Sequence, residues 1–214
     1  MPLLLLIAPY YLNKLIYIAD PDFWVFLATD YLNKFLTLTL LYLVMRRASV
    51  GLPIPWRFGW PTGRQALAVA IGTVALIALD VFSGDAVTWL NDLSGRLTRY
   101  PDAPNALAKY VDDVVGNLLA GFSEETIFRF YLINALLLRG RSRAASVILS
   151  TAIFAAIHWS YGLGAVAFAA AAGLLLAATF LATRSLTVPV LIHALYDAVY
   201  FVGGVTVLQR WLLD

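Results

Sequence analysis

The chain has 214 residues, of which 61% are hydrophobic and 13% are charged, and its formal net charge at pH 7 is +2. Soluble domains carry about a quarter of charged residues, so this composition excludes an ordinary soluble domain and predicts a polytopic membrane protein. The small net charge gives no reason to expect a nucleic-acid partner. The absence of cysteine excludes disulfides, thiolate metal ligands and a cysteine nucleophile.

Apolar runs with about the 17 to 25 residues that a helix needs to cross a bilayer follow one another along the chain. They lie at residues 3–19, 23–45, 65–83, 113–138, 144–160, 163–183 and 186–204. We therefore predict an all-α transmembrane helix bundle of about seven spans, within a range of six to eight. The first run has no basic segment before it and no small-residue cleavage site, so we interpret it as a retained span rather than a signal peptide. Residues 1–214 are expected to form a single integral-membrane domain in a cell membrane, with the lipid bilayer as its surroundings.

Two connections between the apolar runs are long. Residues 46–64 contain three prolines, which prevent a helix from continuing. Residues 84–112 form the longest polar connection, in which we expect no more than a short amphipathic helix. Arginines gather in the loop at residues 46–64, in the loop at residues 139–143 and at Arg184. Alternation across seven spans places these loops on one side, which the positive-inside rule makes cytoplasmic, so the N-terminus is predicted inside and the C-terminus outside.

Ionisable residues inside the apolar runs are the strongest functional signal, because charge at membrane depth is costly. The only two glutamates of the chain are adjacent in the fourth run, Glu124 and Glu125, and Arg129 follows them. Residues four apart share a helix face, so Glu125 can neutralise Arg129, while Glu124, about 100° away around the helix, faces elsewhere. Two acids beside one base leave one acid unpaired, which favours a functional role over a purely structural ion pair.

The only two histidines also lie in apolar runs. Phe154 precedes His158 by one helical turn, and His193 precedes Asp197 by one turn. A carboxylate at that spacing can fix the imidazole tautomer, or both groups can face one ligand. A structural hydrogen bond is the alternative for each histidine.

Together, Glu124, His158, His193 and Asp197 offer two hydrolytic chemistries. A carboxylate in a desolvated cavity can act as general base on water, with a histidine donating to the developing oxyanion. The same four side chains could instead hold a divalent metal such as zinc, with an open position for water. Proton-coupled transport also uses such residues, so these residues alone leave enzyme and transporter open.

The order EExxxR, FxxxH and HxxxD, each motif in its own apolar run, resembles the three-motif pattern of the CAAX protease and bacteriocin-processing (CPBP, or Abi) family. The similarity covers residues of about 116 to 204, and Glu125, Arg129 and Phe154 take the supporting positions of the motifs. It implies an all-helical intramembrane endopeptidase whose substrate is a membrane-associated protein or peptide. The compact chain with arginine-rich loops is typical of a bacterial protein. By the same resemblance, Glu124 activates water with the help of His158, and His193 with its partner stabilises the oxyanion.

Members of this family are described both as glutamate-dependent and as metal-dependent proteases, and we favour the glutamate type without a cofactor. Many members carry asparagine where this chain has Asp197, and an aspartate donates a hydrogen bond only when protonated. Asp197 is therefore expected to be neutral, to orient His193, or to favour metal. The alternatives to an enzyme are a non-catalytic membrane chaperone or immunity protein of the same family, and a small proton-coupled transporter.

Overall fold

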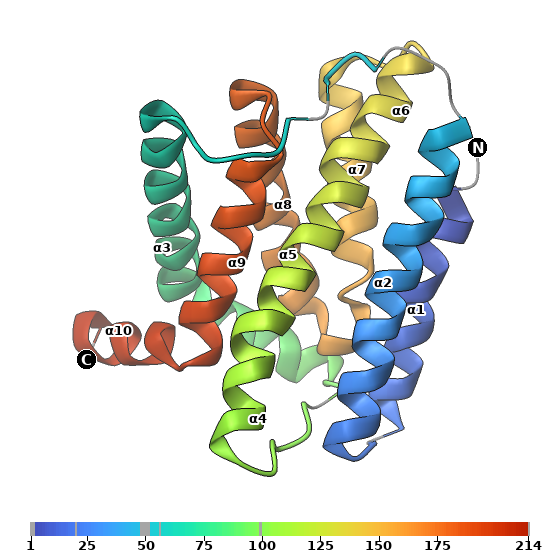
Figure 1. Ribbon diagram of the computed structural model, residues 1–214. Coiled ribbons are helices and arrows are strands. Elements are labelled where there is room, and N and C mark those ends of the chain that lie inside the picture. The colour runs from blue at the N-terminus through green and yellow to red at the C-terminus, as the bar shows by residue number, and fades with distance from the viewer. Residues whose placement is uncertain (1–2, 20, 48–51, 56, 99, 214) are drawn as a thin grey trace.

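The computed structural model describes residues 3–19, 21–47, 52–55, 57–98 and 100–213, which form helices and connecting loops without a strand (Figure 1). The helices are α1 (Leu3–Ile18), α2 (Phe23–Arg47), α3 (Gly63–Ser94), α4 (Ala106–Val111), α5 (Asn117–Glu125), α6 (Ile133–Leu138), α7 (Arg143–Ala156), α8 (Leu163–Thr183), α9 (Thr187–Phe201) and α10 (Gly204–Leu213). Three short segments complete them: the π-helical turns η1 (Asp112–Gly116) and η2 (Thr126–Leu132), and the 3₁₀ turn η3 (Trp159–Tyr161). The all-α fold class is therefore confirmed for the described residues.

The helices fit a membrane protein, although few of them meet strict criteria for a span. Among the described residues, α3 and α8 are long and apolar enough to cross a membrane, and α9 with α10 make a third span if this pair, bent by 73°, is counted as one. The number of about seven spans and the orientation of the termini stay predictions. The loops at residues 57–62, 139–142 and 184–186 do lie at the same end of the bundle (Figure 1), where the amide of Leu186 donates to the carbonyl of Arg57 over 2.9 Å.

Helix α3 is longer than the sequence predicts. The apolar run was expected to end at residue 83, but the helix continues to Ser94, so only the later part of the predicted polar connection is a loop. The helix ends where Gly95 adopts a φ of 72° and its amide donates back to the carbonyl of Asn91. Glycine takes this left-handed backbone at little cost, which makes it a common helix terminator. The predicted start of the polar connection, at residue 84, was wrong. The polar residues between positions 84 and 94 lie on the last turns of α3 and not in a loop.

Residues 106–138 form one continuous helical rod with two π-helical turns in it. The second turn, η2, begins immediately after the two glutamates and is fully buried. Insertions of this kind are rare and occur often at functional sites. The helix therefore changes from α-helical to π-helical geometry immediately after Glu125, within the first motif.

Helix α8 packs against α3, α7 and α9. Its sequence is rich in alanine and glycine, and such small residues allow helix backbones to approach closely in membranes. At Gly173, a β-carbon would come within 3.0 Å of the Thr151 side chain and 3.1 Å of the Phe154 ring. This close contact holds α7 and the second motif against the centre of the bundle.

Candidate active site

The first motif separates its two acids as the spacing predicts. Oε2 of Glu125 lies 3.1 Å from Nε of Arg129, and both side chains are buried, with at most 1% exposed. Charges removed from water in this way are tolerable only as a pair. Glu124 does not take part in this pair, and its carboxylate lines a cavity inside the bundle. The rod thus buries one acid with its base and presents the other to open space.

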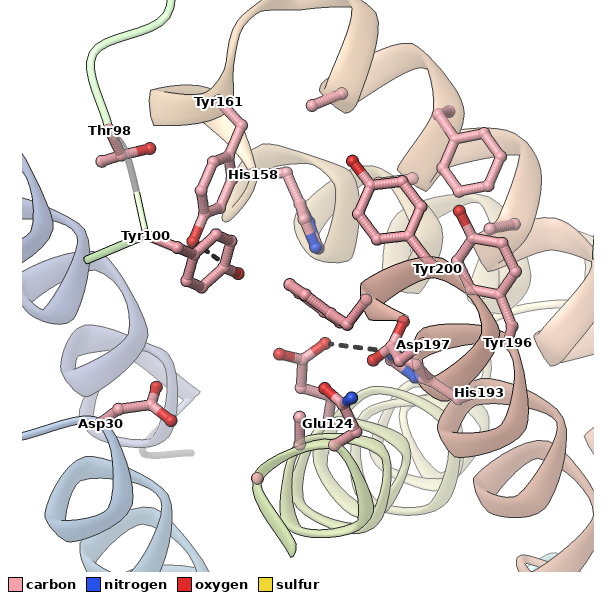
Figure 2. Close-up of a pocket in the computed structure, with 18 of the residues that line it drawn as sticks. Asp30, Thr98, Tyr100, Glu124, His158, Tyr161, His193, Tyr196, Asp197 and Tyr200 are labelled. Carbon is pink, nitrogen blue, oxygen red and sulfur yellow. Dashed lines mark hydrogen bonds and ion pairs between the residues drawn. The ribbon is translucent and has the colours of Figure 1, made fainter. Parts of the chain in front are cut away.

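His193, on α9, contacts three carboxylates. Figure 2 shows two of them, Glu124 and Asp197, beside the imidazole. Its Nδ1 lies 2.9 Å from Oε1 of Glu125, while its Nε2 lies 3.4 Å from Oδ2 of Asp197 and 3.9 Å from Oε2 of Glu124. Because a carboxylate only accepts, Nδ1 of the histidine must carry a proton and donate it to Glu125. That bond leaves Nε2 facing Asp197 and Glu124 at the edge of the cavity.

Glu125 therefore has a second contact that the sequence motifs did not predict. The spacing of His193 and Asp197 suggested that the aspartate could fix the imidazole tautomer, but Nδ1 is held by Glu125, from a different helix. Asp197 contacts the opposite nitrogen. Glu125 joins Arg129 and His193 in one buried chain, so the first and third motifs are connected through this side chain.

His158 does not lie within a helix as the sequence predicts, because α7 ends at Ala156. It occupies the turn between α7 and η3, where its Nδ1 contacts the carbonyl oxygen of Phe154 at 3.0 Å. A carbonyl can only accept, so Nδ1 is the protonated nitrogen and Nε2 of the neutral ring keeps its lone pair. In Figure 2 the imidazole reaches into the same space as Glu124, from the opposite wall.

The aromatic ring of Phe154 contacts residues of all three motifs. Its ring makes an edge contact with the ring of His158, with 5.0 Å between centroids, and a second one with the ring of His193, at 6.1 Å. The guanidinium of Arg129 lies over the same ring, 4.0 Å from its centroid. A cation over an aromatic face is attracted by the ring quadrupole. Phe154 thus packs simultaneously against a residue of each motif.

One cavity of about 800 Å³ brings these groups together. Five side chains that the sequence singled out line it: Glu124, Phe154, His158, His193 and Asp197. Glu125 and Arg129 are buried behind this wall. The cavity extends well beyond the motifs, toward α1, α2 and α3, which the sequence analysis did not connect with the site.

Polar residues of the N-terminal helices were missed as part of the cavity. Asp30 of α2 forms an ion pair with Lys34 and accepts hydrogen bonds from Asn13, at 3.0 Å, and from Tyr17. On α3, Asp80 accepts a hydrogen bond of 2.6 Å from Tyr196. The signal was present in the sequence, because an acid and a base four residues apart inside an apolar run meet the same criterion of charge at membrane depth.

Metal-dependent chemistry would require several ligands among the described side chains. Among them, no three histidine, aspartate or glutamate residues are arranged to hold one metal ion. Oδ2 of Asp197 and Oε2 of Glu124 lie 3.4 Å and 3.9 Å from Nε2 of His193. The geometry is that of a hydrogen-bonded cluster, and we derive no metal-dependent step from it.

A close approach of α5 and α9 positions the first and third motifs. A β-carbon on Gly121 would lie 3.2 Å from both the amide nitrogen of Ala194 and the carbonyl oxygen of Val190. Gly121 precedes Glu125 by one turn, and Ala194 follows His193 directly. The absence of a side chain at Gly121 therefore sets the separation at which Glu125 reaches His193.

We expect Gly121→Val to lower any catalytic activity of the protein by about tenfold or more, because small displacements of reacting groups are costly. Its side chain would push α9 away from α5 and lengthen the Glu125 to His193 contact. Activity of the purified variant, normalised to folded protein, measures this effect. The matched control is Gly63→Ala, since a β-carbon on Gly63 meets nothing within 4 Å. Equal activity of Gly121→Val and wild type would show that the helix separation is not limiting.

The family comparison covers the segment that carries the three motifs. Residues 108–199 match the family model described as type II CAAX prenyl endopeptidase Rce1-like. No curated protein and no solved structure matches the chain. The matched segment contains all three motifs and begins in α4, so α1, α2 and α3 lie outside it.

Proposed function

We propose that the chain is an intramembrane endopeptidase that hydrolyses a peptide bond of a membrane-associated protein or peptide, because residues 108–199 match the family model of the Rce1-like type II CAAX prenyl endopeptidases. The catalytic core corresponds to residues of about 116 to 204 within a single membrane domain. The lipid bilayer is its surroundings, and the substrate enters the cavity that the three motifs line.

Glu124 is the general base in this proposal. Its carboxylate is the acid of the first motif that faces the cavity, because Glu125 is committed to Arg129 and His193. A water molecule between Glu124 and the scissile carbonyl would transfer a proton to the carboxylate as its oxygen attacks the carbonyl carbon. Glu124 would then return that proton to the amine that leaves when the C–N bond breaks.

His158 assists by holding the water. With Nδ1 donating to the carbonyl of Phe154, its Nε2 is an acceptor that faces the cavity. An acceptor can receive the second proton of the water in a hydrogen bond and orient the oxygen toward the substrate. This tautomer suits His158 for positioning water rather than for donating to an oxyanion.

His193 supplies the oxyanion contact. Its Nδ1–H is fixed on Glu125, and its Nε2 lies between Glu124 and Asp197. When the ring carries a second proton, Nε2–H can donate to the oxygen that becomes negative in the tetrahedral intermediate. Asp197, which replaces the asparagine of many relatives, supports this protonated ring through its carboxylate. The reaction then needs no metal cofactor.

The observation that carries the proposal is the contact of His193 with both acids of the first motif, at 2.9 Å and 3.9 Å, on the wall of a cavity that His158 also lines. If the ion pair between Glu125 and Arg129 were only structural, the fold would not need a second acid, Glu124, that faces the cavity. The division between a buried acid and a cavity-facing acid is what a general base with a positioning partner needs.

The test uses purified protein in lipid vesicles and a library of lipid-anchored peptides with randomised sequences, including a farnesylated peptide with a CAAX end. Mass spectrometry of the products identifies any cleaved bond. Wild type is expected to cut a subset of the library at a defined bond. If no peptide is cut under conditions in which the protein stays folded, the endopeptidase proposal fails.

A further inference from the structure

Lys14, on α1, directs its ammonium group into the cavity, outside the segment that matches the family model. Its Nζ donates to the hydroxyl of Tyr161 over 3.2 Å. It also lies 4.4 Å from the centroid of the Tyr161 ring and 5.1 Å from that of Tyr17. Two aromatic rings thus hold the ammonium in place on the cavity wall.

Within the described part of the chain, no carboxylate lies within ion-pairing distance of Lys14. Lys34 differs in this respect, because its charge is neutralised by Asp30. The oxygens of Asp30 are already occupied by Lys34, Asn13 and Tyr17. A charge without an ion-pair partner inside an apolar helix is costly, so its retention points to a ligand that brings the opposite charge.

The ammonium group is close to the second motif. Tyr161 follows His158 by three residues, and their ring centroids lie 6.5 Å apart. The hydroxyl of Tyr161 also donates to Tyr100, at 3.0 Å, so the ring is fixed from two sides. Figure 2 shows His158, Tyr161 and Tyr100 along the same wall. A group bound by Lys14 would therefore lie near the water-holding side of the site.

We propose that Lys14 binds the C-terminal carboxylate of the peptide substrate, an inference that rests on the proposed endopeptidase function. The end of a peptide that enters the cavity brings one negative charge, which the single ammonium neutralises. A lipid phosphodiester carries the same single charge but is bulkier, so more of it would meet the acids that line the rest of the cavity. These are Asp30, Asp80, Asp112, Asp113, Glu124 and Asp197. Lys14 would then select substrates by the charge of their C-terminal end.

The experiment compares two versions of the lipid-anchored peptide library that are identical except for a free carboxylate or an amide at the C-terminus. The ratio of kcat/KM for acid and amide peptides is measured on the same preparation, so it does not depend on how much of a variant is folded. Wild type is expected to prefer the acid by about tenfold or more, as for a hydrogen bond to a charged group. Lys14→Gln is expected to reduce the ratio to about one, mainly through KM.

Two further variants complete the test. Lys14→Arg keeps the charge and is expected to retain most of the preference for the acid. Arg143→Gln removes an exposed charge of α7 that does not line the cavity and is expected to keep the wild-type ratio. A wild-type ratio near one, or an unchanged ratio in Lys14→Gln, would overturn the inference while cleavage itself upholds the proposed function. A wild type that depends on phosphatidylglycerol but shows no acid preference would assign Lys14 to a lipid phosphate and also overturn it. If neither library is cut, both proposals fail.

Discussion

Replacing Glu124 by glutamine is expected to lower peptide cleavage by about a thousandfold, within the range that general-base catalysis contributes. The amide keeps the size and hydrogen-bonding capacity of the side chain but cannot accept a proton from water. Arg129 is paired with Glu125 and not with Glu124. Removing the charge of Glu124 should therefore leave the bundle folded. Single-turnover cleavage in vesicles, together with the unfolding temperature of the variant, measures both expectations.

The control is Asp92→Asn, which removes an exposed acid of α3 that does not line the cavity. It is expected to retain wild-type activity. Glu124→Asp keeps the carboxylate but withdraws it by one methylene, and should fall between wild type and the glutamine variant. Cleavage by Glu124→Gln at a rate within a few-fold of wild type would show that another group activates the water.

Replacing Glu125 by glutamine is expected to cost about 3 to 5 kcal/mol of stability, because it leaves the charge of Arg129 buried without its partner. Arg129→Met should cost a similar amount, since it leaves the carboxylate of Glu125 buried. Met fills much of the volume of the arginine stem and can pack on Phe154. In the double variant both charges are gone, so we expect it to be more stable than either single variant. Unfolding in mild detergent, arranged as a double-mutant cycle, measures the coupling.

The activity of the same double variant distinguishes support from catalysis. Although its stability is expected to recover, the glutamine no longer offers His193 a charged acceptor for Nδ1–H. The imidazole should then be poorly oriented, and cleavage should remain low. Full recovery of activity together with stability would mean that Glu125 serves only to neutralise Arg129.

Contacts within one helix could be predicted from the sequence, and contacts between helices could not. The pairs of Glu125 with Arg129 and of His193 with Asp197 follow from residues that lie four apart. The contact of Glu125 with His193 depends on how closely α5 and α9 approach, which Gly121 sets through its missing side chain. No spacing rule on a single helix contains that information.

The ends of helices were also not predictable from the sequence. His158 was expected within a helix, and the structure places it in the turn after α7, where its ring bonds the carbonyl of Phe154. The apolar run continues through this turn, so hydropathy alone did not mark its start. The cavity-lining role of Lys14 and Asp30 was missed for a different reason. Their charges are unusual within apolar runs, but only the packing of α1 and α2 against the motif helices brings them to the same cavity.

The most direct test of Glu124 as the activating group is cleavage by metal-depleted wild-type protein in water enriched in oxygen-18. The protein is purified and reconstituted in the presence of a chelator, and its metal content is verified before the peptide library is added. We expect full activity, with one heavy oxygen in the new carboxylate of each product formed in a single turnover. Cleavage that stops in the depleted sample and returns when zinc is added would contradict a glutamate-activated water.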